Sequence, residues 1–235
     1  LSPVDTDGAV KNMEAELPGW DFDATVNQSQ QVWNKALNGI AMESADTKVM
    51  KNFYTALYHS MIAPFAYQDT DGRYLGMDKQ VHHAESGYTN YSVFSLWDTF
   101  RALHPLMTLI NPQLATDWGK VMVQGYKEGG ILPKWPLASN YTGCMVGYPA
   151  TSILADLICK DLAEGDLSVW TEAATRSSVY REDLAEKFKG TRELDLIPRH
   201  AYFKEKLGYA PADSLPESVS WGVEMAYYDW CISKI

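Results

Sequence analysis

Two short segments of this 235-residue sequence combine tryptophan with charged and polar side chains. The first contains Trp97, Asp98 and Arg101, and the second is a Leu-Pro-Lys-Trp segment that ends at Trp135. A pyranose ring offers apolar C–H faces to an aromatic plane, and its hydroxyl groups need hydrogen-bond donors and acceptors. Tryptophan beside a carboxylate and a guanidinium supplies all of these. Residues 91–147, which hold both segments, are therefore a candidate sugar-binding region.

Charge and composition narrow the classes of function. Hydrophobic residues make up 46% of the chain, which is ample for a core at this length. The formal net charge of −10 argues against a nucleic-acid partner, because such proteins need a basic surface and the 20 Lys and Arg residues are scattered. The 8 Trp and 14 Tyr residues favour a binding role, since these side chains gather at surfaces that are partly apolar and partly wet. No apolar run reaches the roughly 18 residues of a membrane span.

Two segments contain metal-ligand residue types without the required spacing. Residues 69–74 begin like a calcium loop, but the glycine is fourth rather than sixth and no bidentate glutamate follows at the proper offset. This segment predicts a tight turn instead. His82, His83 and Glu85 also offer ligands, yet adjacent histidines lack the i, i+4 spacing that aims two imidazoles at one ion. We therefore predict no metal site from either segment.

The three cysteines are far apart and odd in number, which indicates neither a disulfide framework nor a zinc knuckle.

His104 precedes a proline, and we expect a partly buried histidine whose hydrogen bonds are satisfied there, rather than a catalytic base. Glu224 and Asp229 are five positions apart, so on a helix they do not share one face and do not form an acid–base pair on geometry alone.

The elements that must position the tryptophan segments are mostly helices. Apolar residues at helical spacing predict helices from residue 23, around 53–65, and over 96–110, 114–128, 150–162, 171–188 and 218–231. Residues 189–217 read as a long loop. Six or seven helices, few strands and long loops predict a mainly α fold that is part of an (α/α)6 toroid or barrel. No internal repeat supports the toroid, and an ordinary helical bundle fits the same periodicity.

The ends of the sequence indicate an excised piece of a longer protein. The chain begins without methionine or a signal peptide and ends at Ile235 inside a helical pattern. Residues 1–23 read as a connector, and residues 24–235 as one partial barrel domain. A partial toroid leaves helix faces uncovered, so we expect dimerisation or association with a cleaved segment of the same chain.

Five motifs in order along the chain resemble glycoside hydrolase family 92, the calcium-dependent exo-acting α-mannosidases. They are residues 69–78 (DTDGRYLGMD), 91–106 (YSVFSLWDTFRALHPL), 130–135 (GILPKW), 144–147 (CMVG), and 218–220 together with 229–232 (SVS and DWCI). Residues 8–22 are similar to the family's link between an N-terminal β-sandwich and its (α/α)6 barrel. The resemblance therefore identifies residues 1–23 as the connector from a missing sandwich.

The resemblance implies inverting hydrolysis of terminal α-mannosides, with an α-mannoside glycan as partner, calcium as cofactor and a periplasmic or cell-surface location. None of the calcium ligands is identified in this sequence. Inverting enzymes need a carboxylic acid and a carboxylate about 6.5–9.5 Å apart. The family carries its acid in a Glu-Gly-Asn-type segment and its base in a Gly-Asp-Glu-Asp-type segment. Neither segment occurs here, so the catalytic residues are expected downstream of Ile235.

What the resemblance assigns to this chain is the sugar-binding part of the site. Asp98 would accept hydrogen bonds from mannose hydroxyls, and Trp135 would pack on the apolar face of the ring. Trp97 and Arg101 flank Asp98, and Arg101 is the expected partner that keeps its carboxylate ionised. Trp97 could equally be plain core, and Arg101 could only brace its helix.

The chain departs from the family pattern in three places. Tyr141 and Tyr228 stand where the family commonly has acidic residues, and Tyr148-Pro149 stands where the family has an acidic or histidine-bearing run. These changes leave two hypotheses open. The chain is either the sugar-binding portion of an α-mannosidase, inactive by itself, or a non-catalytic or degenerate carbohydrate-binding fragment.

Overall fold

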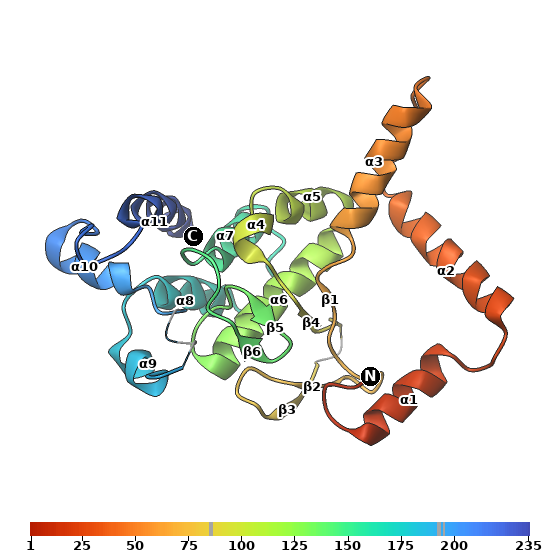
Figure 1. Ribbon diagram of the computed structural model, residues 1–235, viewed down its shortest axis with the longest axis horizontal. Helices are drawn as coiled ribbons and strands as arrows, with labels where there is room; N and C mark the ends of the chain where they lie inside the picture. The colour runs from red at the N-terminus through yellow and green to blue at the C-terminus, as the bar shows by residue number, and fades with distance from the viewer. Residues whose placement is uncertain (85–86, 192–193, 195) are drawn as a thin grey trace.

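The computed structural model describes residues 1–84, 87–191, 194 and 196–235, and the chain is mainly helical, as predicted (Figure 1). Within these residues, helices alternate with three pairs of short strands. The helices are α1 (Thr6–Glu16), α2 (Phe22–Leu37), α3 (Thr47–Ser60), α4 (Leu96–Thr99), α5 (Leu103–Ile110), α6 (Pro112–Gly129), α7 (Ala150–Cys159), α8 (Leu167–Ser177), α9 (Glu182–Lys187), α10 (Arg199–Leu207) and α11 (Ser218–Ile232). The strands are β1 (Phe65–Ala66), β2 (Arg73–Leu75), β3 (Val81–His83), β4 (Tyr91–Ser92), β5 (Pro136–Leu137) and β6 (Asn140–Tyr141).

Helices α1, α2 and α3 form an extended arm on one side of the molecule (Figure 1). Asp5, Asp21 and Asp46 cap them, because each aspartate accepts a hydrogen bond from a backbone N–H of the first turn. The predicted helix near residue 23 is confirmed. None of the residues of α2 is buried, and Val32 is 61% exposed. In the described chain, α3 covers only part of the apolar stripe, where the ring centroid of Tyr58 lies 4.6 Å from that of Trp33.

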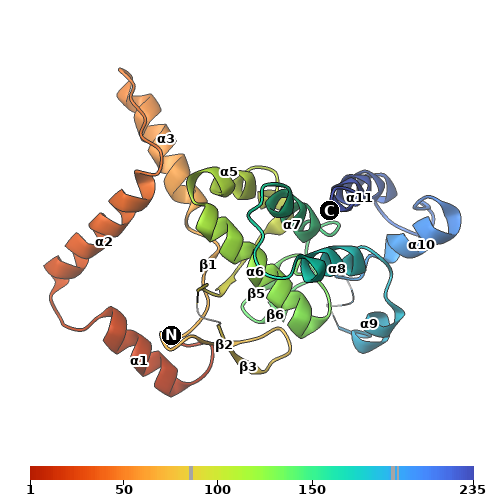
Figure 2. The ribbon, with the colours of Figure 1, turned by 180° about the vertical axis from the view of Figure 1, so that it is seen from behind.

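The central body consists of α5, α6, α7 and α8, seen from behind in Figure 2. Asn111 caps α6, Pro112 occupies its first turn, and Gly130 ends it with a φ of 89°. The main core contains Trp118 and Met122 from α6, Leu154 and Leu157 from α7, and their buried neighbours.

Gly119 allows two of these helices to approach closely. A Cβ atom at this position would lie 2.6 Å from Leu157 and from the indole of Trp170. A glycine inside a helix costs about 1 kcal/mol relative to alanine, and here it allows α6 to pack against α7 and α8.

The strands form two-stranded antiparallel pairs, β1 with β4, β2 with β3, and β5 with β6. The predicted tight turn before β2 is present, since Gly72 N–H donates to the carbonyl of Asp69 over 2.8 Å. The second hairpin, β2–β3, lies against the end of α6 through contacts of Glu128 with Tyr74 and Met77.

Two predicted elements differ from the observed ones. The apolar run over residues 96–110 is divided into α4 and α5, and Pro105 lies in the first turn of the new helix that begins at Leu103, where a proline fits. The expected loop over 189–217 contains α10, which Gly208 ends in a left-handed conformation. In the described part of the chain, no helix has the combination of length and apolarity that membrane spanning demands.

Candidate functional site

The predicted sugar-binding residues lie on α4, in the turn that follows it and on the loop before β5. We call Ser95, Trp97, Asp98, Arg101 and Trp135 the sugar wall. Phe94 and Leu96 are buried beside it and fix the start of α4 in the main core. Val93, just before this segment, has a φ of 67°. Positive φ is a strained conformation for a β-branched residue, and such strain gathers at functional sites.

Asp98 and Trp135 are joined through Ser95. The indole Nε1–H of Trp135 donates to Ser95 Oγ over 2.8 Å, and Ser95 Oγ–H donates to Asp98 Oδ2. The hydroxyl of Thr142 donates to the Trp135 carbonyl over 2.7 Å and holds the same loop. Asp98 is exposed and Trp135 is half-buried, so the two predicted contacts for a sugar share one accessible surface.

Arg101 does not pair with Asp98, and this part of the prediction is wrong. Its Nη2–H donates to Glu224 Oε1 of α11 over 2.9 Å. The guanidinium lies 4.8 Å from the ring centroid of Trp97 and 4.6 Å from that of Phe100, within cation–π range. The residue that braces Asp98 is therefore Ser95, while Arg101 connects α4 to α11.

Trp97 contributes to this connection from a partly buried position. Its ring stacks with Arg101, and its indole Nε1–H has no hydrogen-bond partner among the described residues. A buried donor without a partner costs about 1–3 kcal/mol. A sugar-binding role for Trp97 stays a prediction.

The two acidic residues of α11 have separate partners, as the five-residue spacing predicts. Glu224 accepts hydrogen bonds from Arg101 and from Tyr228 Oη–H over 2.9 Å. Asp229 accepts from Tyr148 Oη–H over 2.6 Å and from Lys204. Burial, then the hydrogen bond to Glu224, raises the pKa of Tyr228 well above its usual range, so this side chain stays a neutral donor.

Tyr141, the other departure from the expected pattern, fastens the Trp135 loop to α6. It is buried, and its hydroxyl lies 3.1 Å from the Gly125 carbonyl and 2.9 Å from that of Ile131. Burial raises the pKa of Tyr141 well above its usual range. An ionised acidic side chain has no proton to donate to these carbonyls, so the tyrosine fits this position structurally.

Sequence reasoning gave no separate role to Ser95 or to the Arg101–Glu224 pair. A signal for Ser95 existed, because a serine three positions before an acidic residue at a helix start has the spacing of a capping box. The Arg101–Glu224 pair spans 123 positions and has no local signal.

The sugar wall itself offers no acidic ligand set for calcium. Calcium prefers six to eight oxygen ligands. In the part of the chain that the structure describes, the one group of His, Cys, Asp or Glu side chains close enough to share an ion is Asp78, His82 and Glu128, on the β2–β3 hairpin and α6. His83 lies outside this group, with its Nδ1 3.0 Å from the Ala84 carbonyl. Glu85 lies outside the described residues.

Comparison with known families gives one match over almost the whole chain. Residues 8–235 match the family model described as the glycosyl hydrolase family 92 catalytic domain. Among the curated proteins, an uncharacterized secreted glycosidase of Arthroderma benhamiae is 24% identical over 245 residues, which are 100% of this chain and 27% of the relative.

Two solved structures share the fold. The family GH92 alpha-mannosidase BT3965 from Bacteroides thetaiotaomicron superposes with a TM-score of 0.86 and 37% identity, over 98% of this chain and 29% of that chain. The family GH92 inverting mannosidase BT2199 from Bacteroides thetaiotaomicron superposes with a TM-score of 0.86 and 26% identity, over 98% of this chain and 30% of that chain. The predicted α/α barrel class is thereby confirmed, and the chain spans less than a third of the length of these relatives.

Proposed function

Because the chain belongs to glycosyl hydrolase family 92, we propose that it forms the sugar-binding part of an α-mannosidase that releases terminal α-mannose with inversion. Two solved relatives are named mannosidases, and one of them is named inverting. The secreted fungal relative supports a further proposal, that the protein acts in the periplasm or at the cell surface.

The observation that carries the proposal is the hydrogen-bonded chain from Trp135 through Ser95 to Asp98. Ser95 Oγ–H donates a hydrogen bond to Oδ2 of Asp98. The other oxygen of this carboxylate, Oδ1, has no hydrogen-bond partner among the described residues. That oxygen remains available to accept a hydrogen bond from a sugar hydroxyl. A charge-assisted bond of this kind contributes about 1.5–3 kcal/mol.

Trp135 supplies the apolar half of the contact. Its Nε1–H is held by Ser95 and its backbone carbonyl by Thr142, so the indole plane is fixed before a sugar arrives. A ring held in this way loses little conformational entropy on binding. The half-buried indole can cover one C–H face of a pyranose while Asp98 contacts its hydroxyls.

The acid and base of hydrolysis are proposed to come from a part of the longer protein that follows these 235 residues. Glu224 accepts hydrogen bonds from Arg101 and Tyr228, and we propose that it joins α11 to the turn after α4 rather than acting as acid or base. Calcium, proposed for the whole enzyme, would draw its ligands from outside the sugar wall.

Sugar binding by the purified chain tests the proposal. Methyl α-mannoside is titrated against the chain and followed by NMR, with methyl α-glucoside, which differs at C2, as the comparison sugar. We expect Asp98→Asn to weaken the mannoside about 10- to 100-fold, and Trp135→Ala to weaken both sugars. Asp161→Asn, an exposed aspartate elsewhere, should change neither. Equal affinities for Asp98→Asn and Asp161→Asn would remove Asp98 from the site.

A hydrolysis assay distinguishes the two hypotheses, which are the sugar-binding portion of an α-mannosidase and a non-catalytic carbohydrate-binding fragment. The 235-residue chain should release no mannose from an aryl α-mannoside, with or without calcium, whereas the longer protein should release it. Release by the chain alone would contradict the proposed division of the site. Binding without hydrolysis by the longer protein would favour the alternative, a non-catalytic carbohydrate-binding fragment.

A further inference from the structure

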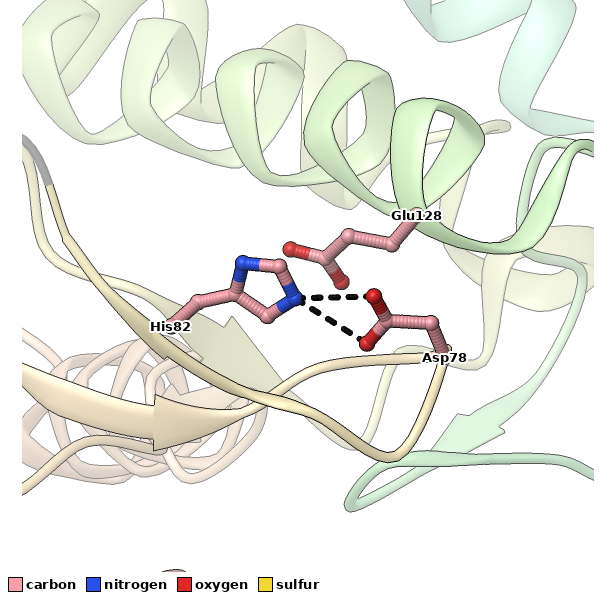
Figure 3. Close-up of side chains that lie close together, drawn as sticks. All are labelled: Asp78, His82 and Glu128. Atoms are coloured by element: carbon pink, nitrogen blue, oxygen red, sulfur yellow. Dashed lines mark hydrogen bonds and ion pairs between the residues drawn. The ribbon is translucent and has the colours of Figure 1, made fainter.

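We propose that Asp78, His82 and Glu128 form a binding site for a zinc-like divalent cation, where the β2–β3 hairpin meets the end of α6. Each side chain offers one ligand atom, and these atoms all lie within 4.8 Å of one another (Figure 3). Asp78 and His82 come from the hairpin and Glu128 from the last turn of α6, so three chain positions converge on one point. The site is separate from the residues of the sugar wall.

Glu128 is held in place by three donors. Tyr74 Oη–H donates to its Oε1 over 2.7 Å, Gln124 Nε2–H donates to the same oxygen over 3.0 Å, and the backbone N–H of Met77 donates to Oε2 over 2.9 Å. Metal-binding carboxylates are typically oriented by hydrogen bonds of this kind. The Glu128 side chain is therefore already ordered, and it loses little conformational entropy when an ion binds.

His82 and Asp78 are oriented toward each other. His82 Nε2 lies 3.0 Å from each carboxylate oxygen of Asp78. The imidazole also stacks against Tyr74, with ring centroids 5.7 Å apart and planes 27° apart. The backbone N–H of Gln80 also donates to Asp78 Oδ1 over 3.0 Å and fixes this carboxylate in the turn between β2 and β3.

Gly76 lets the three side chains meet close over its backbone, and we call this close approach the cradle. A Cβ atom at this position would lie 2.5 Å from His82 Cδ2, 2.8 Å from Asp78 Oδ1 and 2.8 Å from Glu128 Oε2. All three candidate ligands therefore border this glycine, and any larger residue would displace them. Two carboxylates that share such a space repel each other, and a cation between them relieves that repulsion.

The mixture of ligands selects the class of ion. One imidazole nitrogen and two carboxylate oxygens suit Zn²⁺ and similar borderline metals, whereas Ca²⁺ and Mg²⁺ prefer oxygen ligands alone.

Zinc bonds of about 2.0–2.2 Å in a tetrahedron place ligand atoms roughly 3.4 Å apart. The distances between the candidate ligand atoms must therefore shorten by up to about 1.4 Å when zinc binds. His82 Nε2 would release any proton it carries to solvent so that its lone pair can bind the ion, with the remaining ring proton on Nδ1. A water would complete the four ligands.

The test uses the purified chain after dialysis against a chelator. Zn²⁺ is titrated by calorimetry, and Co²⁺ is titrated by visible absorption as a spectroscopic substitute. We expect saturation at about one equivalent and at least a tenfold loss of affinity in His82→Gln, Asp78→Asn and Gly76→Ala. The glycine variant retains all three ligands and removes only the cradle. His83→Gln, one position along the same strand, is the matched control and should bind like the unchanged chain.

Several outcomes would overturn the proposal. These are no saturable Zn²⁺ binding, an equal loss in His83→Gln, or retained binding in both His82→Gln and Asp78→Asn. The exposed thiols of Cys144 and Cys159 are an alternative source of Zn²⁺ affinity, and a thiolate charge-transfer band with Co²⁺ would assign the ion to them. Binding of Ca²⁺ in preference to Zn²⁺ would contradict the proposed class of ion. Circular dichroism of each variant separates loss of the site from loss of the fold.

Discussion

At the scale of single residues, Ser95 explains how two distant parts of the sequence make one surface. Ser95 and Trp135 are 40 positions apart, and one hydroxyl group both accepts from the indole and donates to Asp98. The predicted arginine partner of Asp98 proved to pair with Glu224 instead. A neutral hydroxyl braces Asp98 without cancelling its charge, which leaves the carboxylate a strong acceptor.

Removing this hydroxyl should loosen both sides of the sugar wall. In Ser95→Ala, Asp98 and Trp135 lose their shared partner, and the affinity for methyl α-mannoside should fall about 5- to 10-fold, the value of one hydrogen bond of about 1–1.4 kcal/mol. Ser95→Thr restores a hydroxyl and should recover most of the affinity. NMR titration of the three proteins measures the effect, and failure of threonine to rescue would assign the loss to altered packing.

His104 differs from its predicted state in a way that affects stability. It is buried against Phe94 and Trp118, and its Nε2 has no hydrogen-bond partner among the described residues. The sequence predicted a satisfied, partly buried histidine, so burial was underestimated. Burial lowers the pKa of His104 from its usual value of 6.5 to about 3.

This depressed pKa predicts a pH dependence of folding. Below about pH 6.5 the unfolded chain binds a proton at His104 that the folded chain excludes, so stability is complete above that pH and falls toward pH 3. The loss at pH 5 is about 2 kcal/mol. His104→Phe should flatten the dependence of the urea midpoint on pH between 7 and 5. Parallel curves for the two proteins would show that His104 does not titrate on unfolding.

At the scale of elements, helical spacing located most of the helices but not their partners. The periodicity around residues 23, 150 and 218 predicted α2, α7 and α11, because an apolar stripe at a 3.6-residue period is a local property. Helix α10 was missed, since its flanking prolines and glycines dominate the local pattern. Helical spacing also located the apolar face of α2 but not its exposure, because burial depends on neighbours that a single helix does not encode.

The same distinction applies to the candidate sites. Asp98 and Trp135 were found by motif, and the structure brings them together through Ser95. Glu128 was not found, because no spacing rule connects the end of α6 with His82. The sequence therefore indicated which residues could do chemistry, and the tertiary fold decided which of them meet.

Asp69 connects the first helix to the turn before β2. It is buried and accepts hydrogen bonds of 2.8 Å from Ser2 Oγ–H and from Asn12 Nδ2–H, with Arg73 3.6 Å away. This contact places α1 beside the β2–β3 hairpin, where the N-terminus also lies (Figure 1). Thr70 and Arg73 add to this contact, since the backbone N–H of Thr70 donates to Asn12 Oδ1 and Arg73 Nη1–H donates to Asp5 Oδ2, each over 2.8 Å. Asp69 is the buried carboxylate among these partners.

Replacing this carboxylate should release α1 from the body. In Asp69→Ala two donors lose a charged partner, and docking should weaken by about 2–3 kcal/mol. Limited proteolysis should then cut the first helix faster than in the unchanged chain. Asp71→Ala removes a neighbouring carboxylate that contacts Arg73 and, over 3.7 Å, the exposed Lys11 of α1, and loss of these surface ion pairs should have little effect. Equal cleavage rates in both variants would show that Asp69 does not hold the helix.

At the scale of the whole molecule, the arm of α1, α2 and α3 exposes an unusual amount of apolar surface. Trp20 is 102% exposed and Phe22 is 77% exposed at the joint between α1 and α2, and Val32 continues this surface along α2. Large contiguous apolar patches on a protein surface favour association. The sequence-based expectation of a dimer or an attached segment stays a prediction, and the exposed arm supplies its physical basis.

Light scattering after size exclusion, with intact mass on the same sample, tests this expectation. We expect a mass that rises with concentration, together with a single covalent mass for the chain. Combined Trp20→Ser and Phe22→Ser should shift the protein toward monomer, while Leu207→Ser, an exposed leucine on α10, should not. A concentration-independent monomer would contradict the prediction.

The ion pair between Arg101 and Glu224 also affects the order in which contacts form while the chain is synthesised. The two residues are 123 positions apart, and the ribosome adds about 5–20 residues per second, so the Glu224 partner emerges roughly 6–25 seconds after Arg101. During that interval the guanidinium can lie over Trp97 and Phe100 but has no carboxylate from α11. The Arg101–Glu224 contact is therefore made late in synthesis, after the helices of the central body have had time to pack.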